Sequence, residues 1–177
     1  DPYWHILDGG QSASVRDALR LGYRIGFVAG TDNHQGHPTQ GIGKYSDLTC
    51  FRAPELTREA IWQAMDQRRT YATTGSAIIA DFSVNGYPSG TEGSLSEGED
   101  VHFSATLHGT APIEVVEIIS NDVTVWRSKP EEWDLDLDHI SIPAPQGGAR
   151  SAYYYLRLRQ VDGHIAWLSP VWLDRAR

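Results

Sequence analysis

One apolar run, RIGFVAG at residues 24–30, constrains the fold of this chain more than any other feature. Apolar residues that follow one another without polar alternation are typical of a strand covered on both faces, as in a parallel sheet. Only one such run occurs, and a strand flanked by two helices would have unpaired backbone on both edges. We therefore expect its partner strands in a longer parent protein, in the C-terminal part of this chain, or in another copy of the chain.

A short helix is expected before this run, at residues 12–22. Ser14 is a candidate N-cap, and Asp17 follows three residues later, which is the spacing of a capping box. Gly22 is placed to end the helix, because glycine readily adopts the left-handed conformation found at helix ends. Three apolar residues recur at helical spacing on this segment: Val15, Ala18 and Leu19.

A second helix is expected to begin near Thr57, after a Gly-rich loop at residues 36–43 and an apolar patch at 48–51. Leu56 and Ile61 occupy the two positions of a hydrophobic staple. The two helices and the apolar run together predict a short α-β-α unit at residues 1–74. The expected buried stripe of the second helix comprises Leu56, Ala60, Ile61, Ala64 and Met65.

From residue 75 onward, short strands separated by turn signals predict a β-sandwich. Asn85-Gly86 and Asp162-Gly163 are expected hairpin turns, because both dipeptides tolerate positive φ angles. Pro170 indicates that the last strand lies at an edge or is bulged there. The expected fold class is α+β, with an immunoglobulin- or fibronectin-like antiparallel sandwich of roughly seven strands at residues 75–177. We expect those strands at residues 77–84, 101–108, 113–120, 122–128, 138–142, 152–161 and 164–173.

Composition narrows the class of protein. The chain has 177 residues and a formal net charge of −8, which works against binding nucleic acid. No apolar run approaches the roughly 18 residues needed to cross a bilayer, so no membrane partner is expected. The single Cys50 excludes a disulfide within the chain, and the cellular compartment stays open.

Polar side chains of metal-ligand type follow the apolar run. Asp32 and His34 are two residues apart, so on an extended backbone their side chains point the same way. One carboxylate and one imidazole that share a direction suit a divalent metal such as zinc, manganese or iron. His37 is a further donor within reach, and His5 is a weaker candidate. The alternative is that residues 32–36 only form a turn, since two ligands do not close a metal site.

Three other patterns have a structural interpretation that we favour over a functional one. Arg69 could bind an anion, but it lies at an expected helix end, where cations are favoured. The acidic run at residues 131–138 does not follow the EF-hand pattern and fits an extended segment with one apolar face. The aromatic residues at 153–155, together with Trp167 and Trp172, could line a sugar site but more commonly pack in a core.

Two stretches resemble the end of a PHP (polymerase and histidinol phosphatase) domain: GYRIGFVAGTDNHQGHP at residues 22–38 and LTREAIWQAMDQRRTYATTG at residues 56–75. The likeness is greatest to the branch of PHP-type metallohydrolases with a β-rich C-terminal extension, which AWLSPVW at residues 166–172 resembles more loosely. In that family a distorted (β/α)₇ barrel holds two or three metal ions. A late strand of the barrel ends in Asp-x-His, whose two ligands match Asp32 and His34.

The resemblance implies that this chain is the C-terminal part of a metal-dependent hydrolase. The family's opening His-x-His, and its Glu and His ligands, are absent here, so an upstream barrel of the same parent chain is the expected partner. The parent would bind a divalent metal (Zn, Mn or Fe) and hydrolyse a small-molecule substrate, commonly a phosphate ester, with His37 as a substrate contact. The fragment would be incomplete, with no catalytic side chain of its own, and the metal is expected in the parent protein rather than in the fragment alone.

The alternative function is a non-catalytic β-sandwich module that binds a carbohydrate or a protein. Self-association to complete the sheet is a further alternative for the expected partner of the orphan strand. A strand ending in His-x-His upstream of Asp1 would support the hydrolase parent.

Overall fold

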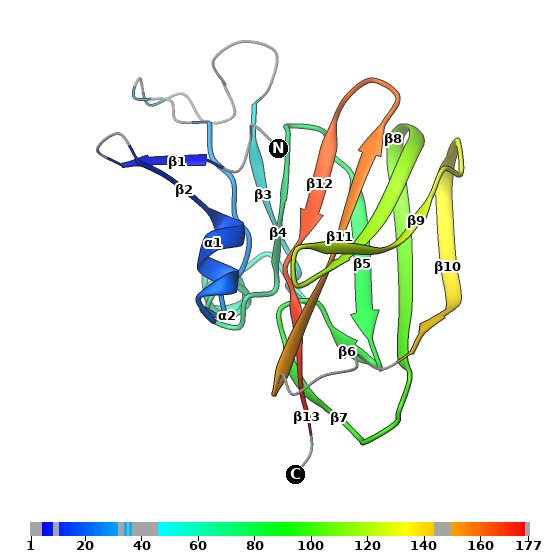
Figure 1. The fold of residues 1–177 in the computed structure, drawn as a ribbon. Coiled ribbons are helices and arrows are strands. Elements are labelled where there is room, and N and C mark those ends of the chain that lie inside the picture. The colour runs from blue at the N-terminus through cyan, green and yellow to red at the C-terminus, as the bar shows by residue number, and fades with distance from the viewer. Residues whose placement is uncertain are drawn as a thin grey trace.

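The chain is mostly β-structure, with a few short helices near its N-terminus (Figure 1). The computed structural model describes the backbone of residues 5–8 and 11–13, and the backbone and side chains of residues 14–31, 34, 36, 46–143 and 150–175. The α+β class expected from the sequence is therefore confirmed in its coarse form, as a β-rich fold with a small helical part. Among the described helices, none has the length and apolar character of a membrane span.

Eleven of the described strands form one curled sheet, and two more form a separate hairpin, β1 (His5–Asp8) with β2 (Gln11–Ser14). The pairs in the large sheet are antiparallel except for β7 with β13, which is parallel. Its strands are β3 (Leu48–Phe51), β4 (Thr70–Thr73), β5 (Ile79–Val84), β6 (Tyr87–Pro88), β7 (Glu92–Leu95), β8 (Val101–Ser120), β9 (Val123–Ser128), β10 (Glu132–Ile142), β11 (Ser151–Gln160), β12 (Ile165–Leu168) and β13 (Val171–Arg175).

The strand β8 organises this sheet, because it pairs with β5, β9, β10 and β11. The sequence predicted two strands here, at residues 101–108 and 113–120, whereas the structure has one strand of 20 residues. At the junction the fully buried side chain of Gln160 accepts a hydrogen bond from the Thr110 N–H at 2.8 Å. The side-chain oxygen of Gln160 thus accepts a backbone hydrogen bond at a point where the strand pairing is irregular. The strand therefore continues through the junction.

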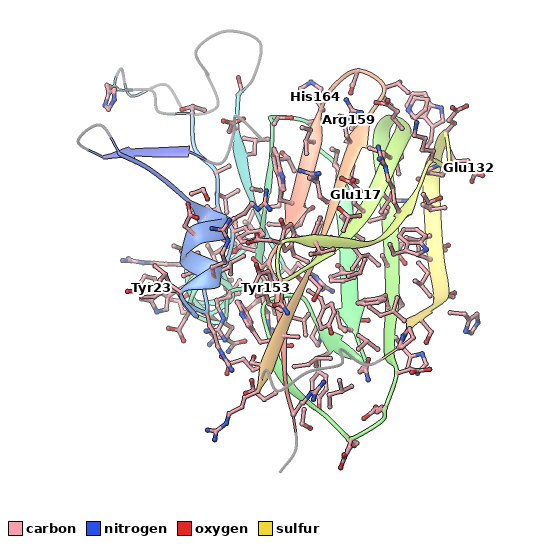
Figure 2. All side chains as sticks on the ribbon, in the orientation of Figure 1. Tyr23, Glu117, Glu132, Tyr153, Arg159 and His164 are labelled. Atoms are coloured by element: carbon pink, nitrogen blue, oxygen red, sulfur yellow. The ribbon has the colours of Figure 1, made fainter. Side chains whose placement is uncertain are left out.

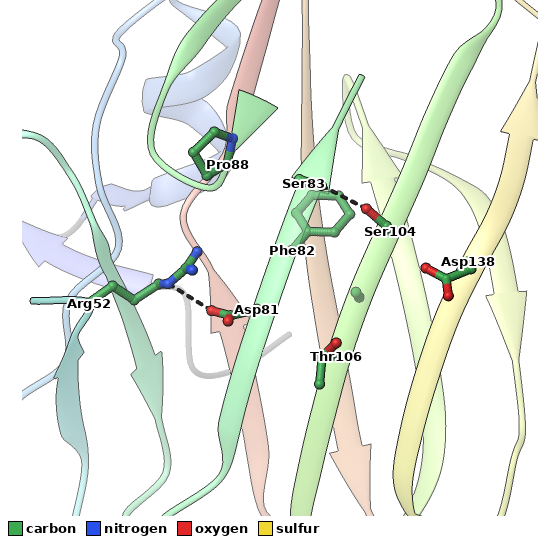
Figure 3. A pocket seen from close by; sticks show the side chains of 9 residues that line it. Arg52, Asp81, Phe82, Ser83, Pro88, Ser104, Thr106 and Asp138 are labelled. Atoms are coloured by element: carbon green, nitrogen blue, oxygen red, sulfur yellow. Dashed lines mark hydrogen bonds and ion pairs between the residues drawn. The ribbon is translucent and has the colours of Figure 1, made fainter. Parts of the chain in front are cut away.

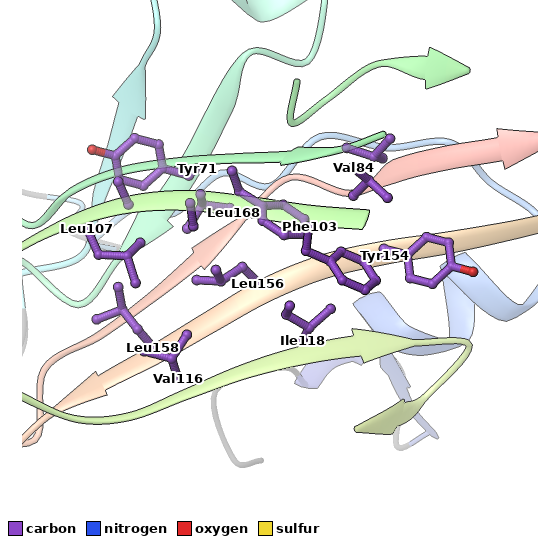
Figure 4. Packing of buried hydrophobic residues seen from close by; sticks show 14 of the residues in the cluster. Tyr71, Val84, Phe103, Leu107, Val116, Ile118, Tyr154, Leu156, Leu158 and Leu168 are labelled. Atoms are coloured by element: carbon purple, nitrogen blue, oxygen red, sulfur yellow. The ribbon is translucent and has the colours of Figure 1, made fainter. Parts of the chain in front are cut away.

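The concave side of the sheet encloses the main hydrophobic core (Figure 4). Phe103 lies between Phe82 and Tyr154, at ring-centroid distances of 6.2 and 5.4 Å. Leu107, Leu156 and several of their neighbours are fully buried around these rings. Inward-facing side chains of β5, β8 and β11 supply this packing, so the alternation expected for a half-buried sheet is present.

A second apolar cluster joins the N-terminal part to the other face of the sheet. Leu19 and Phe27 pack there against residues of β4, β8, β11, β12 and β13. Phe27 meets the ring of Tyr155 edge-on, at 5.4 Å between centroids. The residues that share this cluster with Leu19 and Phe27 are Ala72, Ile119, Tyr153, Tyr155, Trp167 and Trp172.

The first expected helix is confirmed as α1 (Val15–Arg20). Ser14 caps it, and Asp17 completes the capping box. Gly22 has φ +87°, and the N–H groups of Gly22 and Tyr23 donate to the carbonyls of Leu19 and Ala18. This is the Schellman arrangement, so the helix ends where the glycine signal placed its end.

The second helix, α2 (Arg58–Asp66), is capped by Thr57 as expected, but its predicted buried stripe is wrong in part. Ala60 and Ala64 are buried, whereas Leu56 is 94% exposed and Met65 is 48% exposed. The small side chains let the helix approach the sheet closely. The large apolar side chains have no neighbour to cover them among the described residues.

The turns and strand ends of the large sheet agree in part with those expected from the sequence. Asn85 and Gly86 both have positive φ and connect β5 to β6, as expected for this dipeptide. The ladder breaks at Ser169-Pro170, between β12 and β13, because proline lacks the N–H that would continue it. Beyond residue 75 the described residues contain nine strands rather than roughly seven: β6, β7 and the split of the last strand add three, and the merger of two expected strands into β8 removes one. The domain boundary after residue 74 stays a prediction, and β3 and β4 from before it continue the large sheet.

Candidate functional site

The extended segment at residues 23–31 leads to the predicted ligands. The Phe27 N–H donates to Ser169 Oγ at 2.8 Å, and the Ala29 N–H donates to Thr49 Oγ1 at 2.9 Å. The Thr49 hydroxyl returns a hydrogen bond to the Ala29 carbonyl at 2.7 Å. Hydroxyl groups therefore hold one edge of this segment. In the part of the chain that the structure describes, no strand ladder includes it, so the expected parallel-type strand is extended but unpaired as a strand.

The direction of this segment fixes where it ends. Gly26 lies close to Arg68 and Thr70, whereas Ala29 contacts Thr49, so the segment runs antiparallel to β3. Thr31 is two residues beyond Ala29, so it lies level with Asp47, the residue that precedes β3. The segment therefore ends at the edge of the sheet where β3 begins and β4 ends (Figure 1). Asp32 and His34 follow directly after it.

The structure describes only part of the predicted site. His34 is described and its side chain is exposed, whereas Asp32, His37 and the side chain of His5 lie outside the described residues. The convergence of Asp32 with His34 therefore stays a prediction. Among the described residues, which exclude Asp32 and His37, no group of three or more His, Cys, Asp or Glu side chains could hold a metal ion.

Asp47 is a candidate residue that sequence reasoning missed. It immediately precedes β3, and its Oδ1 atom is buried with no hydrogen-bond partner among the residues that the structure describes. Burial raises the pKa of this carboxyl above its ordinary value. A buried carboxylate oxygen normally has a donor or a cation beside it, so Asp47 has an unused capacity for one. An aspartate next to an apolar patch carries no motif, and nothing in the sequence could have identified it.

Around Asp47, the end of the sheet is tightly joined. Thr74 Oγ1 lies 3.1 Å from His164 Nδ1 and accepts a hydrogen bond from the Ile165 N–H at 2.9 Å. Gly75, at φ +90°, allows the chain to approach Ser46, because a Cβ there would lie 2.7 Å from the Ser46 carbonyl oxygen. Figure 2 shows His164 at this end of the sheet. These contacts hold the residues around Asp47 closely against the end of β4 and the start of β12.

Ion pairs fix the other end of the N-terminal part. Arg24 pairs with Glu92 and, at 2.6 Å, with Asp174. Arg68 pairs with Glu92 at 2.7 Å, and its guanidinium lies 5.2 Å from the centroid of the Trp172 ring. Arg24 and Arg68 thus have structural partners at the end opposite Asp47.

A polar groove of about 260 Å³ lies across β5, β8 and β10 (Figure 3). Arg52 pairs with Asp81 at 2.7 Å on one side of it, and Ser83 Oγ lies 2.7 Å from Ser104 Oγ. Asp138 lies on the other side. Arg52, Asp81 and the two serines of this groove thus have partners within it, and the one aromatic ring that lines it, Phe82, is buried.

The aromatic residues considered for a sugar site pack in the two cores, as the structural interpretation predicted. The tyrosines at 153–155 are at most 6% exposed, and Trp167 and Trp172 are at most 5% exposed. Figure 2 shows Tyr153 where the sheet meets α1. The acidic run forms most of β10, with Leu135 and Leu137 packed on the main core, so its extended interpretation is also confirmed.

Comparison with known proteins gives similarity without a described activity. The family model "Protein of unknown function (DUF3604)" matches residues 40–92. The chain is also similar to three chlamydial proteins. They are described as uncharacterized proteins of Chlamydia trachomatis, Chlamydia pneumoniae and Chlamydia muridarum, at 34%, 34% and 33% identity.

Each chlamydial alignment covers 91% of this chain but 29% of the relative. The chain thus spans less than a third of the length of these relatives. No solved structure gives a significant match.

Proposed function

We propose that this chain is the C-terminal part of a PHP-type metal-dependent hydrolase that acts on phosphoester bonds of a small molecule. The observation that carries the proposal is the position of Asp32-x-His34 directly after an extended segment in which, among the described residues, Phe27 and Ala29 are hydrogen-bonded along one edge. A strand of a (β/α)₇ barrel would be extended and unpaired in this way if the neighbouring barrel strands were not part of the chain. The chlamydial relatives, more than three times as long as the aligned region, are consistent with a larger parent.

The side chains near this end of the sheet suit a divalent metal. Asp32 and His34 offer a carboxylate and an imidazole, which zinc, manganese and iron accept. Asp47, which immediately precedes β3, adds a carboxylate oxygen that is buried and has no hydrogen-bond partner among the described residues. A divalent metal held there would lower the pKa of a bound water toward neutrality and so supply the nucleophile.

In this proposal, residues of this chain supply two metal ligands, one substrate contact and the hydroxyl groups that position the ligands. Asp32 and His34 hold the cation, and His37 contacts the substrate. The hydroxyls of Thr49 and Ser169 fix the segment that carries the ligands, since they hold its backbone on one edge. The remaining ligands come from the upstream barrel, so no complete metal site is assigned to this chain alone.

We further infer that the curled sheet corresponds to the immunoglobulin- or fibronectin-like extension expected after residue 75. Its concave core and antiparallel ladders support this assignment. The alternative of a carbohydrate-binding module has less support, because the aromatic side chains that would stack on sugar rings are buried.

The proposal is tested by measuring bound metal and phosphodiesterase activity in the complete parent protein. Asp32→Ala and His34→Ala should each lower the metal content and reduce hydrolysis of a model phosphodiester by about a hundredfold or more. Asp136→Ala and His102→Ala are matched controls, because both side chains are exposed on strands of the large sheet. The isolated 177-residue chain should show little hydrolysis.

Two results would contradict the proposal. One is full metal content and activity in both ligand variants of the parent. The other is strong metal-dependent turnover by the isolated chain, which would mean that it holds a complete site.

A further inference from the structure

We propose that the outer face of α2 and the open edge of residues 24–30 are the surface on which the rest of the parent polypeptide docks. The inference rests on the proposed function for the nature of that partner, an α/β domain. The surface itself is defined by described residues alone. It is called the docking face below, and its residues are Val28, Leu56, Ile61, Trp62 and Met65.

The α2 part of the docking face is apolar and hollow. Leu56 is 94% exposed, Trp62 is 68% exposed and Met65 is 48% exposed. Together with Ile61 they line a hollow of about 660 Å³ along the helix. A nine-residue helix that turns its alanines to the sheet and its largest apolar side chains to solvent has its hydrophobic face uncovered.

The strand-like part of the docking face has an open backbone edge. Backbone groups of alternate residues in an extended segment point to opposite edges. Phe27 and Ala29 donate to hydroxyls of this chain, whereas Gly26, Val28 and Gly30 have no hydrogen-bond partner among the described residues. Val28 is also 65% exposed. An extended segment of this kind can accept a further strand along its free edge.

Exposed apolar side chains are concentrated in this part of the molecule. Among the described residues, seven of the eleven large exposed apolar side chains belong to residues 21–65, and four belong to the much longer remainder. The seven are Leu21, Tyr23, Val28, Phe51, Leu56, Trp62 and Met65. Scattered surface apolar residues are normal, but Leu56, Trp62 and Met65 line one hollow, and a contiguous exposed apolar patch marks an interaction surface.

The rest of the parent polypeptide is the occupant that fits these features best. The alignments leave 71% of each chlamydial relative (100 − 29) outside the region shared with this chain. A partner with a strand edge and an apolar helical layer would satisfy the open backbone and cover α2 in one interface. A second copy of this chain is a poorer fit, because each copy carries a net charge of −8.

Hydrogen–deuterium exchange tests the inference. It should be measured by mass spectrometry on the complete parent and on the isolated chain. Peptides that cover residues 24–30 and α2 should exchange roughly ten-fold more slowly in the parent, whereas peptides from β10 should be unchanged. A parent carrying Leu56→Lys and Trp62→Lys should lose this protection. Trp133→Lys is the matched control, because Trp133 is 55% exposed on β10.

The possible outcomes are distinct. Equal exchange of α2 in both proteins would overturn the docking face, as would a parent gene that encodes nothing beyond this chain. Protection of α2 in the isolated chain that disappears on dilution would show that a second copy covers the face, and would also overturn the inference. Metal content of the same parent sample separates the two proposals. A parent that binds metal but shows no protection of α2 would contradict the docking face and leave the proposed hydrolase intact. A parent that protects α2 but binds no metal would contradict the hydrolase and leave the docking face intact.

Discussion

At the scale of single residues, the Asp47 carboxylate lowers the stability of the isolated folded chain at neutral pH. Its buried Oδ1 has no hydrogen-bond partner in the described part of the chain, and burial raises the pKa of the carboxyl. The folded chain therefore holds this proton more tightly than the unfolded chain, so stability falls as pH rises through the range above the ordinary value of 3.8. Asp47→Asn should raise the melting temperature of the isolated chain at pH 7 by about 2–4 °C.

The gain from Asp47→Asn should disappear as the pH is lowered below 3.8, where the wild-type carboxyl is protonated in both states. Thermal unfolding followed by circular dichroism between pH 3 and pH 8 measures this. Asp136→Asn is the control, because Asp136 is exposed. A loss of stability at pH 7 in Asp47→Asn would mean that the carboxylate has a stabilising partner.

Asp122 acts in the opposite direction. Partial burial works to raise its pKa, but hydrogen bonds from Arg16 and Arg20 bring it below the ordinary value. The stability from this contact is present above pH 3.8 and is lost as the pH falls through the lowered pKa. Because Asp122 has φ 70°, Asp122→Asn keeps the turn between β8 and β9 and removes only the charge.

Asp122→Asn should lower the melting temperature at pH 7 by about 2–4 °C and speed hydrogen exchange in α1. The difference from the wild type should shrink toward pH 3. An unchanged α1 exchange rate at pH 7 would show that the apolar cluster around Leu19 holds the helix without this ion pair.

At the scale of elements, Gly90 allows the segment before β7 to pack closely against Arg68, which lies between α2 and β4. Gly90 has φ +90°, and a Cβ at this position would overlap the carbonyl of Arg68. Gly98 has φ +76° but open space around it. Gly98→Ala should therefore cost about 1 kcal/mol of unfolding free energy, from the backbone conformation alone.

Gly90→Ala carries the same backbone cost and adds the overlap with Arg68. It should lower the unfolding free energy by about 3 kcal/mol or more. Urea denaturation of the two variants gives the comparison directly. Equal costs would show that the connection between residue 68 and residue 90 can shift.

Local signals in the sequence predicted the elements that depend on local chemistry. The cap at Ser14, the helix end at Gly22 and the turn at Asn85-Gly86 follow from side-chain hydrogen bonds and positive φ angles, which neighbouring residues determine. The continuity of β8 could not be predicted in this way, because it depends on Gln160, about fifty residues away. The pairing of β4 with β12 is still more remote in sequence, since Ala72 pairs with Trp167.

The candidate site was less predictable than the fold. Asp32 and His34 were predicted from their spacing and from the family resemblance and stay predictions, whereas Asp47 has no motif and becomes a candidate only through its burial. The expected stripe on α2 was wrong at Leu56 and Met65 for a related reason. Periodicity identifies an apolar helix face, but it cannot tell which polypeptide covers that face.

At the scale of the whole molecule, the two ends of the chain differ in how complete they are. The β-rich part encloses a core of fully buried side chains, and its strands pair with one another. The N-terminal part has exposed apolar side chains, an extended segment with an open edge, and a carboxylate oxygen without a partner. These three features are explained together if the neighbouring domain of the parent covers the helix, pairs with the segment and completes a metal site beside Asp47.

The most direct test of this account is a crystal structure of the complete parent protein, with anomalous scattering recorded at the absorption edges of zinc, manganese and iron. The account predicts an anomalous peak within about 2.0–2.3 Å of both a carboxylate oxygen of Asp32 and an imidazole nitrogen of His34. Ligands from a preceding domain should complete its coordination. A metal bound elsewhere in the parent, with Asp32 and His34 pointing apart, would contradict it.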